Sequence, residues 1–268
     1  MLKVDHLTVR RGGRLVLDGV GFALRPGEVT AVLGLNGAGK TTLLKAVLGF
    51  LPREAGEVTA GGRDLDRLSP ADRARKLAYV PQLYDGGFRY PAEEFVSMGA
   101  TAYLGAFSRP GRAELRRAGE ILEELGCGHL TGRPMDRLSG GEQRMAYLAR
   151  AVMQDADCLL LDEPVSSLDF SRQHLFLERL RRYVERRRAG CLATIHAPEL
   201  AYAYGDRVLI LHGGRVLLDA ARTDPDYEGR LAAGLEAIYG PRTRVRFRDG
   251  ALALGWERAG PAPRPRPG

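Results

Sequence analysis

Nine consecutive residues, Gly34-Leu35-Asn36-Gly37-Ala38-Gly39-Lys40-Thr41-Thr42, carry more information about this chain than any other segment. They fit the pattern G-x-x-x-x-G-K-[ST] at every constrained position, with a second threonine added. The apolar run over 28–33 predicts a buried strand before them, and 42–48 predicts a helix after them. Because glycines let backbone N–H groups turn inward and a helix N-terminus adds partial positive charge, this arrangement predicts a polyphosphate site. A plain glycine-rich turn would not need the final Lys-Thr-Thr.

The side chains at the end of this loop have separate expected tasks. Lys40 should reach the β- and γ-phosphates of a nucleotide, and the Thr41 hydroxyl should hold Mg²⁺. The residues expected to bind the nucleotide here are Gly34, Asn36, Gly37, Ala38, Gly39, Lys40, Thr41 and Thr42.

Composition and charge narrow the classes of protein that fit. The chain has 268 residues with 44% hydrophobic and 27% charged residues, which is ordinary for a globular protein. No apolar run approaches the ~18 residues of a membrane-spanning helix, and the start lacks the apolar segment of a signal peptide. We therefore expect a cytoplasmic chain.

The net charge of +7 invites a nucleic-acid interpretation, but the pattern of charges argues against it. The densest basic cluster, 179–188, is mixed with Glu178 and Glu185 and follows a helical repeat of Leu177, Leu180 and Val184, which is typical of a solvated helix face. We expect no nucleic-acid partner. An anionic membrane surface or an acidic partner explains the excess charge at least as well.

The order of apolar runs predicts an α/β fold. Short β-like runs over 2–33, with turn signals between them, and a hairpin at 56–62 predict an antiparallel sheet beside the strand that carries the loop. The pattern is helical from about 91 to 152, and strand-like runs then alternate with helices to about 211. The predicted fold is a P-loop NTPase (RecA-like) core with an N-terminal antiparallel β-subdomain and an inserted helical subdomain.

A second chemical signal is the segment Cys158-Leu159-Leu160-Leu161-Asp162-Glu163-Pro164. Its apolar residues predict a buried strand, and two carboxylates follow at the end where ligands of such sheets bind. Asp162 is placed to help hold Mg²⁺. Glu163 is placed to polarise a water for in-line attack on the γ-phosphate.

A third signal is Leu138-Ser139-Gly140-Gly141-Glu142-Gln143, just before a helical run. A serine, two glycines and a helix N-terminus form another potential anion site. A chain with one nucleotide has no obvious use for two such sites, unless the second serves a neighbouring molecule.

These motifs together resemble those of the ATP-binding cassette (ABC) family, over about residues 2–220. The segment beginning at Leu138 resembles the family's signature motif, and its Ser139 lies 23 residues before Asp162. Gln82 resembles the Q-loop glutamine that contacts the metal and senses the γ-phosphate. Ser167-Leu168-Asp169 resembles the D-loop, and His196 resembles the switch histidine.

The resemblance implies a dimer in which ATP acts as a clamp. Two such domains pack head to tail, so that Ser139, Gly140 and Gly141 of one chain, with Asp169 of the D-loop, meet the ATP held by the other. Glu163, His196 and Gln82 are then the expected catalytic residues, and Thr41, Gln82 and Asp162 the expected metal ligands. With one cassette in the chain, the partner should be an identical chain.

The resemblance also implies a division of the chain. Residues 1–225 form the expected ABC ATPase domain, with its helical subdomain at about 91–152. A C-terminal extension over 226–257 contains a helix-like piece to Tyr239 and an alternating run over 243–248. Residues 258–268 are only Arg, Pro, Gly and Ala, and should be disordered.

A finer resemblance concerns the cargo. The run from Asp64 to Gln82, the pair Met98-Gly99 and the ending Ile238-Tyr239-Gly240 are similar to ATPases that import iron-siderophores, haem and cobalamin. Molybdate and other metal-chelate importers share much of this pattern. The implied protein is the ATPase subunit of a bacterial importer, on the inner face of the membrane.

Its implied partners are an integral membrane permease, docked by residues between Gln82 and about Gly105, and indirectly a periplasmic or lipoprotein substrate-binding protein. A soluble ABC ATPase of DNA repair or iron–sulfur assembly is an alternative, although such relatives tend to carry coiled-coil insertions or a second cassette. An ATP-gated module with little turnover is a third interpretation, and the presence of both Glu163 and His196 argues against it.

The sequence departs from the family pattern in three places. The family usually has an aromatic residue near position 11 to stack on adenine, whereas this chain has Arg11. A guanidinium can stack on a base, so Arg11 is a candidate nucleotide contact, and a surface arginine is the alternative. Ala197 replaces an acid after the switch histidine and Val165 replaces a usual threonine, yet neither should remove a phosphate contact.

Overall fold

A six-stranded sheet forms the centre of the molecule in a computed structural model, which describes residues 1–82, 89–104 and 108–257. Its strand order is β10-β9-β3-β8-β7-β6. The strands are β3 (Val29–Leu33), β6 (Leu77–Val80), β7 (Cys158–Leu161), β8 (Gly190–Thr194), β9 (Arg207–His212) and β10 (Arg215–Ala221). All neighbours pair in parallel except β10, which runs antiparallel to β9. Parallel strands need crossover helices, which explains the alternation of helices and apolar runs in the sequence.

A separate antiparallel sheet lies beside this core, in the order β2-β1-β4-β5. It comprises β1 (Leu2–Arg11), β2 (Arg14–Leu24), β4 (Ala55–Ala60) and β5 (Arg63–Asp64). The β1–β2 turn is made by Gly12 and Gly13, whose φ angles of 54° and 77° favour glycine. The prediction of an N-terminal antiparallel sheet beside an α/β core is therefore confirmed.

The inner strands β3, β7 and β8 are buried at every position, because helices or the second sheet cover both faces of the central sheet. Val32 of β3 faces a hydrophobic core shared with the antiparallel sheet and α1 (Lys40–Val47). Ala31 and Leu33 face the opposite core, which four other helices cover. These helices are α5 (Gly140–Met153), α6 (Phe170–Arg187), α7 (Pro198–Tyr204) and α8 (Tyr227–Tyr239).

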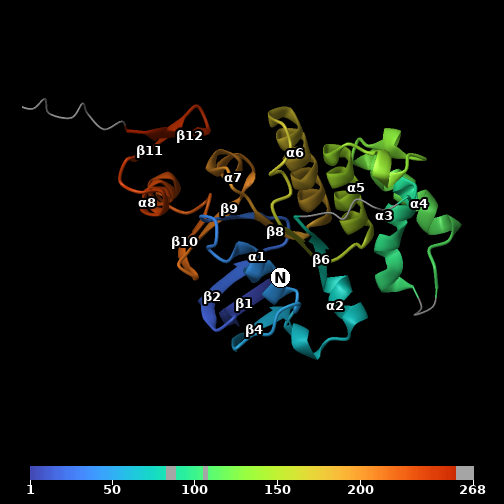
Figure 1. The fold of residues 1–268 in the computed structure, drawn as a ribbon, viewed down its shortest axis with the longest axis horizontal. Helices are drawn as coiled ribbons and strands as arrows, with labels where there is room; N and C mark the ends of the chain where they lie inside the picture. The colour runs from blue at the N-terminus through green and yellow to red at the C-terminus, as the bar shows by residue number, and fades with distance from the viewer. Residues whose placement is uncertain (83–88, 105–107, 258–268) are drawn as a thin grey trace, which may run out of the picture.

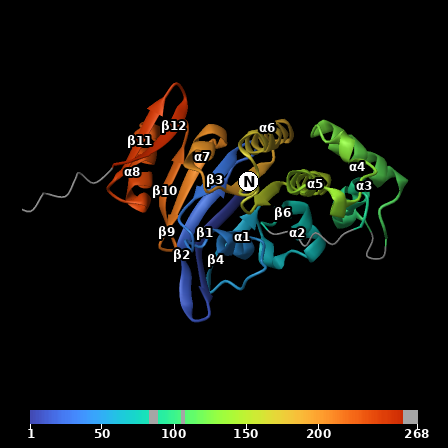
Figure 2. The same cartoon turned by 45° about the horizontal axis from the view of Figure 1, so that its top comes forward.

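The segment predicted to be helical contains α3 (Ala92–Ser97) and α4 (Arg112–Glu124), which pack against α5 and against each other. Short 3₁₀ turns span Met98–Tyr103, Gly128–Leu130 and Met135–Arg137, and another, Leu65–Arg67, precedes α2 (Pro70–Lys76). Figures 1 and 2 both place α3 and α4 at one end of the molecule and the C-terminal strands at the other.

The C-terminal strands form a two-stranded ribbon, β11 (Thr243–Arg248) and β12 (Ala251–Trp256). The inner face of the ribbon packs on the main core through Val245, Phe247 and Leu252. The tail 258–268 lies outside the described residues, and the domain boundaries given above remain predictions. No helix in the described part of the chain is both long and apolar enough to cross a membrane.

Candidate functional site

The glycine loop connects β3 to α1, and its shape depends on particular glycines. A Cβ at Gly34 would lie 2.5 Å from the backbone oxygen of Leu211, so no other residue fits there. Gly37 and Gly39 have φ angles of 81° and 103°, in the region that favours glycine. Gly39 caps α1 without a side-chain hydrogen bond, which leaves the first N–H groups of the helix available to an anion.

Lys40 lies over this loop and is buried, with 6% of its surface exposed. Its Nζ donates to the backbone oxygens of Gly34 at 2.7 Å and Leu35 at 3.3 Å. Burial lowers the pKa of the Lys40 ammonium, while the nearby carboxylates of Glu163 and Asp162 oppose that shift. A bound polyphosphate would favour the charged form in the same way.

A cavity of about 350 Å³ opens at the loop. Its wall contains residues 36–42 of the loop and helix, together with Arg11, Val16 and Glu163. Arg11 occupies the sequence position at which the resembled family usually has an aromatic residue, and it lies beside the phosphate loop. Val16 was not predicted from the sequence.

Asp162 follows β7 and is almost wholly buried, with 1% exposure. Its Oδ1 accepts hydrogen bonds from the hydroxyls of Thr41, at 3.2 Å, and Thr194, at 3.0 Å. A carboxylate next to the Thr41 hydroxyl is the oxygen-rich pair that Mg²⁺ prefers. Within the described residues no three or more His, Cys, Asp or Glu side chains form a metal cluster, but Mg²⁺ commonly takes one or two protein ligands and completes its shell with phosphate and water.

Glu163 is held by two other predicted catalytic residues. Gln82 Nε2 donates to its Oε2 at 2.5 Å, and His196 Nε2 contacts its Oε1. The Glu163 N–H donates to the Thr194 hydroxyl at 2.8 Å. The carboxylate is therefore oriented from both sides, as a general base must be, at the rim of the phosphate cavity. Gln82 lies on Glu163 here, and its contact with a metal stays a prediction.

The signature segment begins α5 with a reciprocal capping arrangement. Ser139 Oγ accepts from the Glu142 N–H, and Glu142 Oε2 accepts from the Ser139 N–H at 2.8 Å. Burial raises the pKa of Glu142, but hydrogen bonds from Arg133 and Ser139 outweigh it and lower that pKa to about 2. Both the N–H and the hydroxyl of Ser139 contribute to this lowering, so the capping pair is closed within the chain.

The two glycines of this segment have different surroundings. A Cβ at Gly140 would meet nothing within 4 Å, whereas one at Gly141 would lie 3.3 Å from Leu168 and 3.2 Å from Arg172. Gly141 is thus packed against the predicted D-loop, and Gly140 faces open space.

The structure of one chain does not bring every predicted residue to the phosphate cavity. Among the residues described, four predicted ones are absent from its wall: Ser139, Gly140, Gly141 and Asp169. Asp169 instead caps α6, accepting from the Arg172 N–H at 2.9 Å. In one chain these four residues therefore lie outside the cavity, and their contact with a nucleotide stays a prediction.

Two residues of the site were missed from the sequence. Thr194 connects Asp162 to the Glu163 backbone, and Arg144 donates to the backbone oxygen of Glu163 at 2.8 Å. Thr194 is a polar residue in an apolar run, whereas Arg144 follows the polar residues Glu142 and Gln143 and shows as unusual only by its burial in the structure. For Thr194 that anomaly was the available signal, since buried polar groups need partners.

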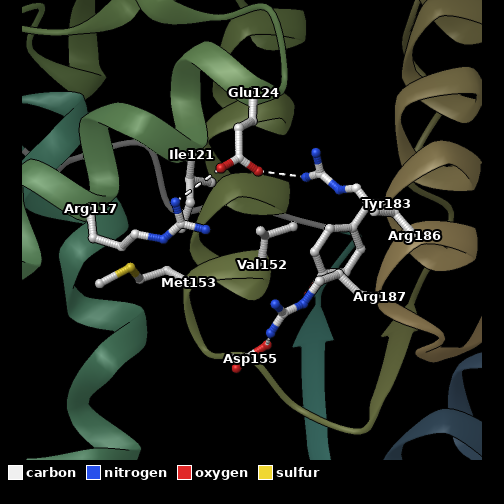
Figure 3. A pocket seen from close by; sticks show the side chains of 9 residues that line it. All are labelled: Arg117, Ile121, Glu124, Val152, Met153, Asp155, Tyr183, Arg186 and Arg187. Atoms are coloured by element: carbon white, nitrogen blue, oxygen red, sulfur yellow. Dashed lines mark hydrogen bonds and ion pairs between the residues drawn. The ribbon is translucent and has the colours of Figure 1, made fainter.

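A larger cavity of about 540 Å³ lies away from this site, between α4, α5 and α6. Figure 3 shows that its charged groups contact groups of opposite charge: Glu124 contacts both Arg117 and Arg186, and Arg187 contacts Asp155. It contains none of the predicted site residues.

Comparison with known proteins gives concordant results. Residues 17–166 match the family model described as "ABC transporter". A "Probable iron chelatin transport ATP-binding protein" of Helicobacter pylori is 34% identical over 244 residues, 89% of this chain and 96% of that protein. The "Hemin import ATP-binding protein HmuV" of Pseudomonas aeruginosa is 40% identical over 220 residues, 80% of this chain and 84% of that protein.

Solved structures share the fold. An inward-facing structure assigned to a metal-chelate type ABC transporter has a TM-score of 0.78 at 24% identity, and covers 94% of this chain and 95% of that one. A dimeric ATP-binding cassette with bound ADP and phosphate has a TM-score of 0.73 at 24% identity, and covers 84% of this chain and 100% of that one.

Proposed function

The chain belongs to the ABC transporter family of ATPases, and from that membership we propose that it energises a bacterial importer of an iron chelate or haem through a separate permease. As a member of the family it binds ATP and hydrolyses it to drive transport. The finer parts of the proposal concern the chemistry, the dimer, the permease and the cargo.

The observation that carries the proposed chemistry is the placement of Glu163. Its carboxylate lies at the rim of the phosphate cavity and is held by Gln82 and His196. Glu163 would accept a proton from the attacking water, and His196 would fix the orientation of the carboxylate. Lys40 and the N–H groups at the start of α1 would bind the phosphates, with Arg11 against the base of the nucleotide.

Asp162 and Thr41 would hold Mg²⁺, with Gln82 as a further ligand. The bound ion would neutralise charge on the β- and γ-phosphate oxygens. The close contact between the Asp162 carboxylate and the Thr41 hydroxyl supports this assignment.

We propose a head-to-tail dimer of identical chains as the active form. Gly140, which has open space around it, and Ser139 at the start of α5 lie outside the cavity of their own chain, which supports a role for them on the partner's ATP, together with Gly141 and Asp169. Dimeric cassettes of the same fold support the arrangement.

The permease would dock beside Gln82, so that the chain would lie on the inner face of the membrane. Residues 83–88 and 105–107 of the predicted docking segment lie outside the described residues. An apolar groove of about 490 Å³ that opens next to this segment, with Phe50, Tyr79 and Pro81 in its wall, supports the location. A substrate-binding protein would then be an indirect partner.

The proposed cargo rests on the two relatives above, of which one is named for probable iron chelatin transport and the other for hemin import. Reconstitution of the chain with its permease, followed by uptake of radiolabelled haem, ferric siderophore and molybdate, separates these cargoes. Uptake of molybdate alone would contradict the proposal.

The proposed catalytic role of Glu163 has a direct test. Glu163→Gln should abolish phosphate release, leave ATP binding intact and trap an ATP-bound dimer that gel filtration with light scattering detects. Normal hydrolysis by this variant would show that Glu163 is not the base.

A further inference from the structure

Arg144 is a buried arginine that connects three separate parts of the site. It lies on α5, shortly after the signature segment, with 5% of its surface exposed. Its Nη1 donates to the backbone oxygen of Glu163 and its Nη2 to the Ser167 hydroxyl, both at 2.8 Å. One guanidinium therefore joins the signature helix, the catalytic glutamate and the D-loop.

The backbone of Glu163 is in a conformation that must be held in place. Its φ angle is 49°, in the left-handed region that non-glycine residues rarely adopt. Pro164 follows it, and a residue before proline is normally driven towards extended conformations. Such strain costs on the order of 1–3 kcal/mol and persists only where surrounding contacts fix it.

Two of these contacts lie on opposite sides of the residue. Thr194 accepts from the Glu163 N–H, and Arg144 donates to its carbonyl oxygen. Hydrogen bonds from a charged donor are stronger than neutral ones, and more so when buried. Arg144 is thus well placed to keep the Glu163 peptide from turning.

The guanidinium is a rigid plane, so its two bonds cannot adjust independently. A movement of the first turns of α5 would shift the Glu163 carbonyl and Ser167 together. Ser139 and Gly140, at the start of the same helix, are the groups proposed to meet the partner's ATP.

We propose that Arg144 is a positioning residue: it holds the Glu163 carboxylate in its productive orientation and makes that orientation depend on the signature helix. This inference rests on the proposed function of Glu163 as the base. Arg144 then affects the rate of hydrolysis and has no effect on the affinity for ATP.

The test compares full-length Arg144→Ala, Arg144→Lys and the control Arg150→Ala, which removes an exposed arginine from the same helix. Arg144→Ala should lower kcat at least about 10-fold while KM and the Kd of a fluorescent ATP analogue stay within about 3-fold, because loss of positioning affects the chemical step. Arg144→Lys should recover part of kcat, since an ammonium cannot donate in the two fixed directions of the fork. Arg150→Ala should match the wild type.

A purely structural role would give a different pattern, in which the melting temperature and ATP affinity fall together with kcat. That pattern, or wild-type kcat in Arg144→Ala, would overturn the inference. If Arg144→Ala does not fold, Arg144→Lys decides: a reduced kcat with normal melting temperature supports the inference, and a wild-type kcat overturns it.

The double variant Arg144→Ala/Glu163→Gln separates this inference from the function on which it rests. It should still form the ATP-trapped dimer, because Arg144 is not assigned to ATP binding. Loss of trapping only in the double variant would contradict the role given to Arg144. Failure of Glu163→Gln alone to trap a dimer would instead contradict the proposed function.

Discussion

Replacing Gly140 with alanine should make the protein more stable and less active, a combination that only a functional glycine explains. Gly140 is the first residue of α5, and an added Cβ would meet nothing within 4 Å. Alanine is favoured over glycine in helices by up to about 1 kcal/mol, and at a helix end we expect about 0.5 kcal/mol. For a chain of this size that corresponds to a rise in melting temperature of about 1–2 °C.

The same methyl group would lie on the surface proposed to close on the partner's ATP. It would keep phosphate oxygens away from the N–H groups at the start of α5. Loss of one donor to a developing charge typically costs about 10²–10³ in rate, so we expect kcat to fall at least about 10-fold. Phosphate release at saturating ATP measures this, and calorimetry measures the stability.

Gly119→Ala is the matched control. Gly119 lies within α4, and its Cβ would also meet nothing within 4 Å. This variant should gain stability by the same mechanism and keep wild-type kcat. If Gly140→Ala hydrolysed ATP like the wild type, the reasoning about this surface would be refuted.

Two further predictions concern ion pairs. The pKa of Glu142, about 2 against an ordinary 4.5, means that its contribution to stability is present above about pH 4.5 and is lost as the pH falls towards 2. Glu142→Gln should therefore lower the free energy of unfolding by about 1–2 kcal/mol at pH 7, after discounting for solvent screening. Below pH 5 the free energy of unfolding, measured by urea titration, should fall less steeply with pH in the variant than in the wild type. Equal slopes in the two proteins would contradict this. Glu124→Ala breaks the partly exposed contacts with Arg117 and Arg186 at the cavity of Figure 3, and should cost less than about 1 kcal/mol for each contact, reduced further by salt, with unchanged ATPase activity. A larger or salt-independent loss would show that these contacts have a structural role beyond surface ion pairs.

Much of the fold could be predicted because its signals are local. The glycine loop, the buried strand before Asp162 and the turn at Gly12 each follow from backbone geometry within a few residues. The prediction missed β6, β10 and β12. β6 is an edge strand of only four residues, β10 is an antiparallel edge strand that includes Arg215 and Asp219, and β12 alternates small and apolar residues. β10 and β12 lack the continuous apolar run that marks a central strand.

The candidate site was predicted as a set of residues and not as a network. Gln82 and Glu163 are 81 residues apart, and nothing local in the sequence indicates that they touch. The links made by Thr194 and Arg144 are of the same kind, because they depend on the packing of a strand and a helix around the end of β7. Pattern reasoning identifies the groups that need partners, and tertiary structure decides which partners they have.

Mixing two variants of low activity tests most directly whether each ATP is shared between chains. Lys40→Ala removes the cation of the phosphate loop, and Gly140→Ala blocks the start of α5, which is proposed to close on the partner's ATP. In a mixed dimer one site should therefore carry both changes, and the other should carry neither. After mixing, ATPase activity should rise to as much as about a quarter of the wild type, since about half of the dimers are mixed and each has one good site. Activity equal to the average of the two separate variants would contradict the shared site.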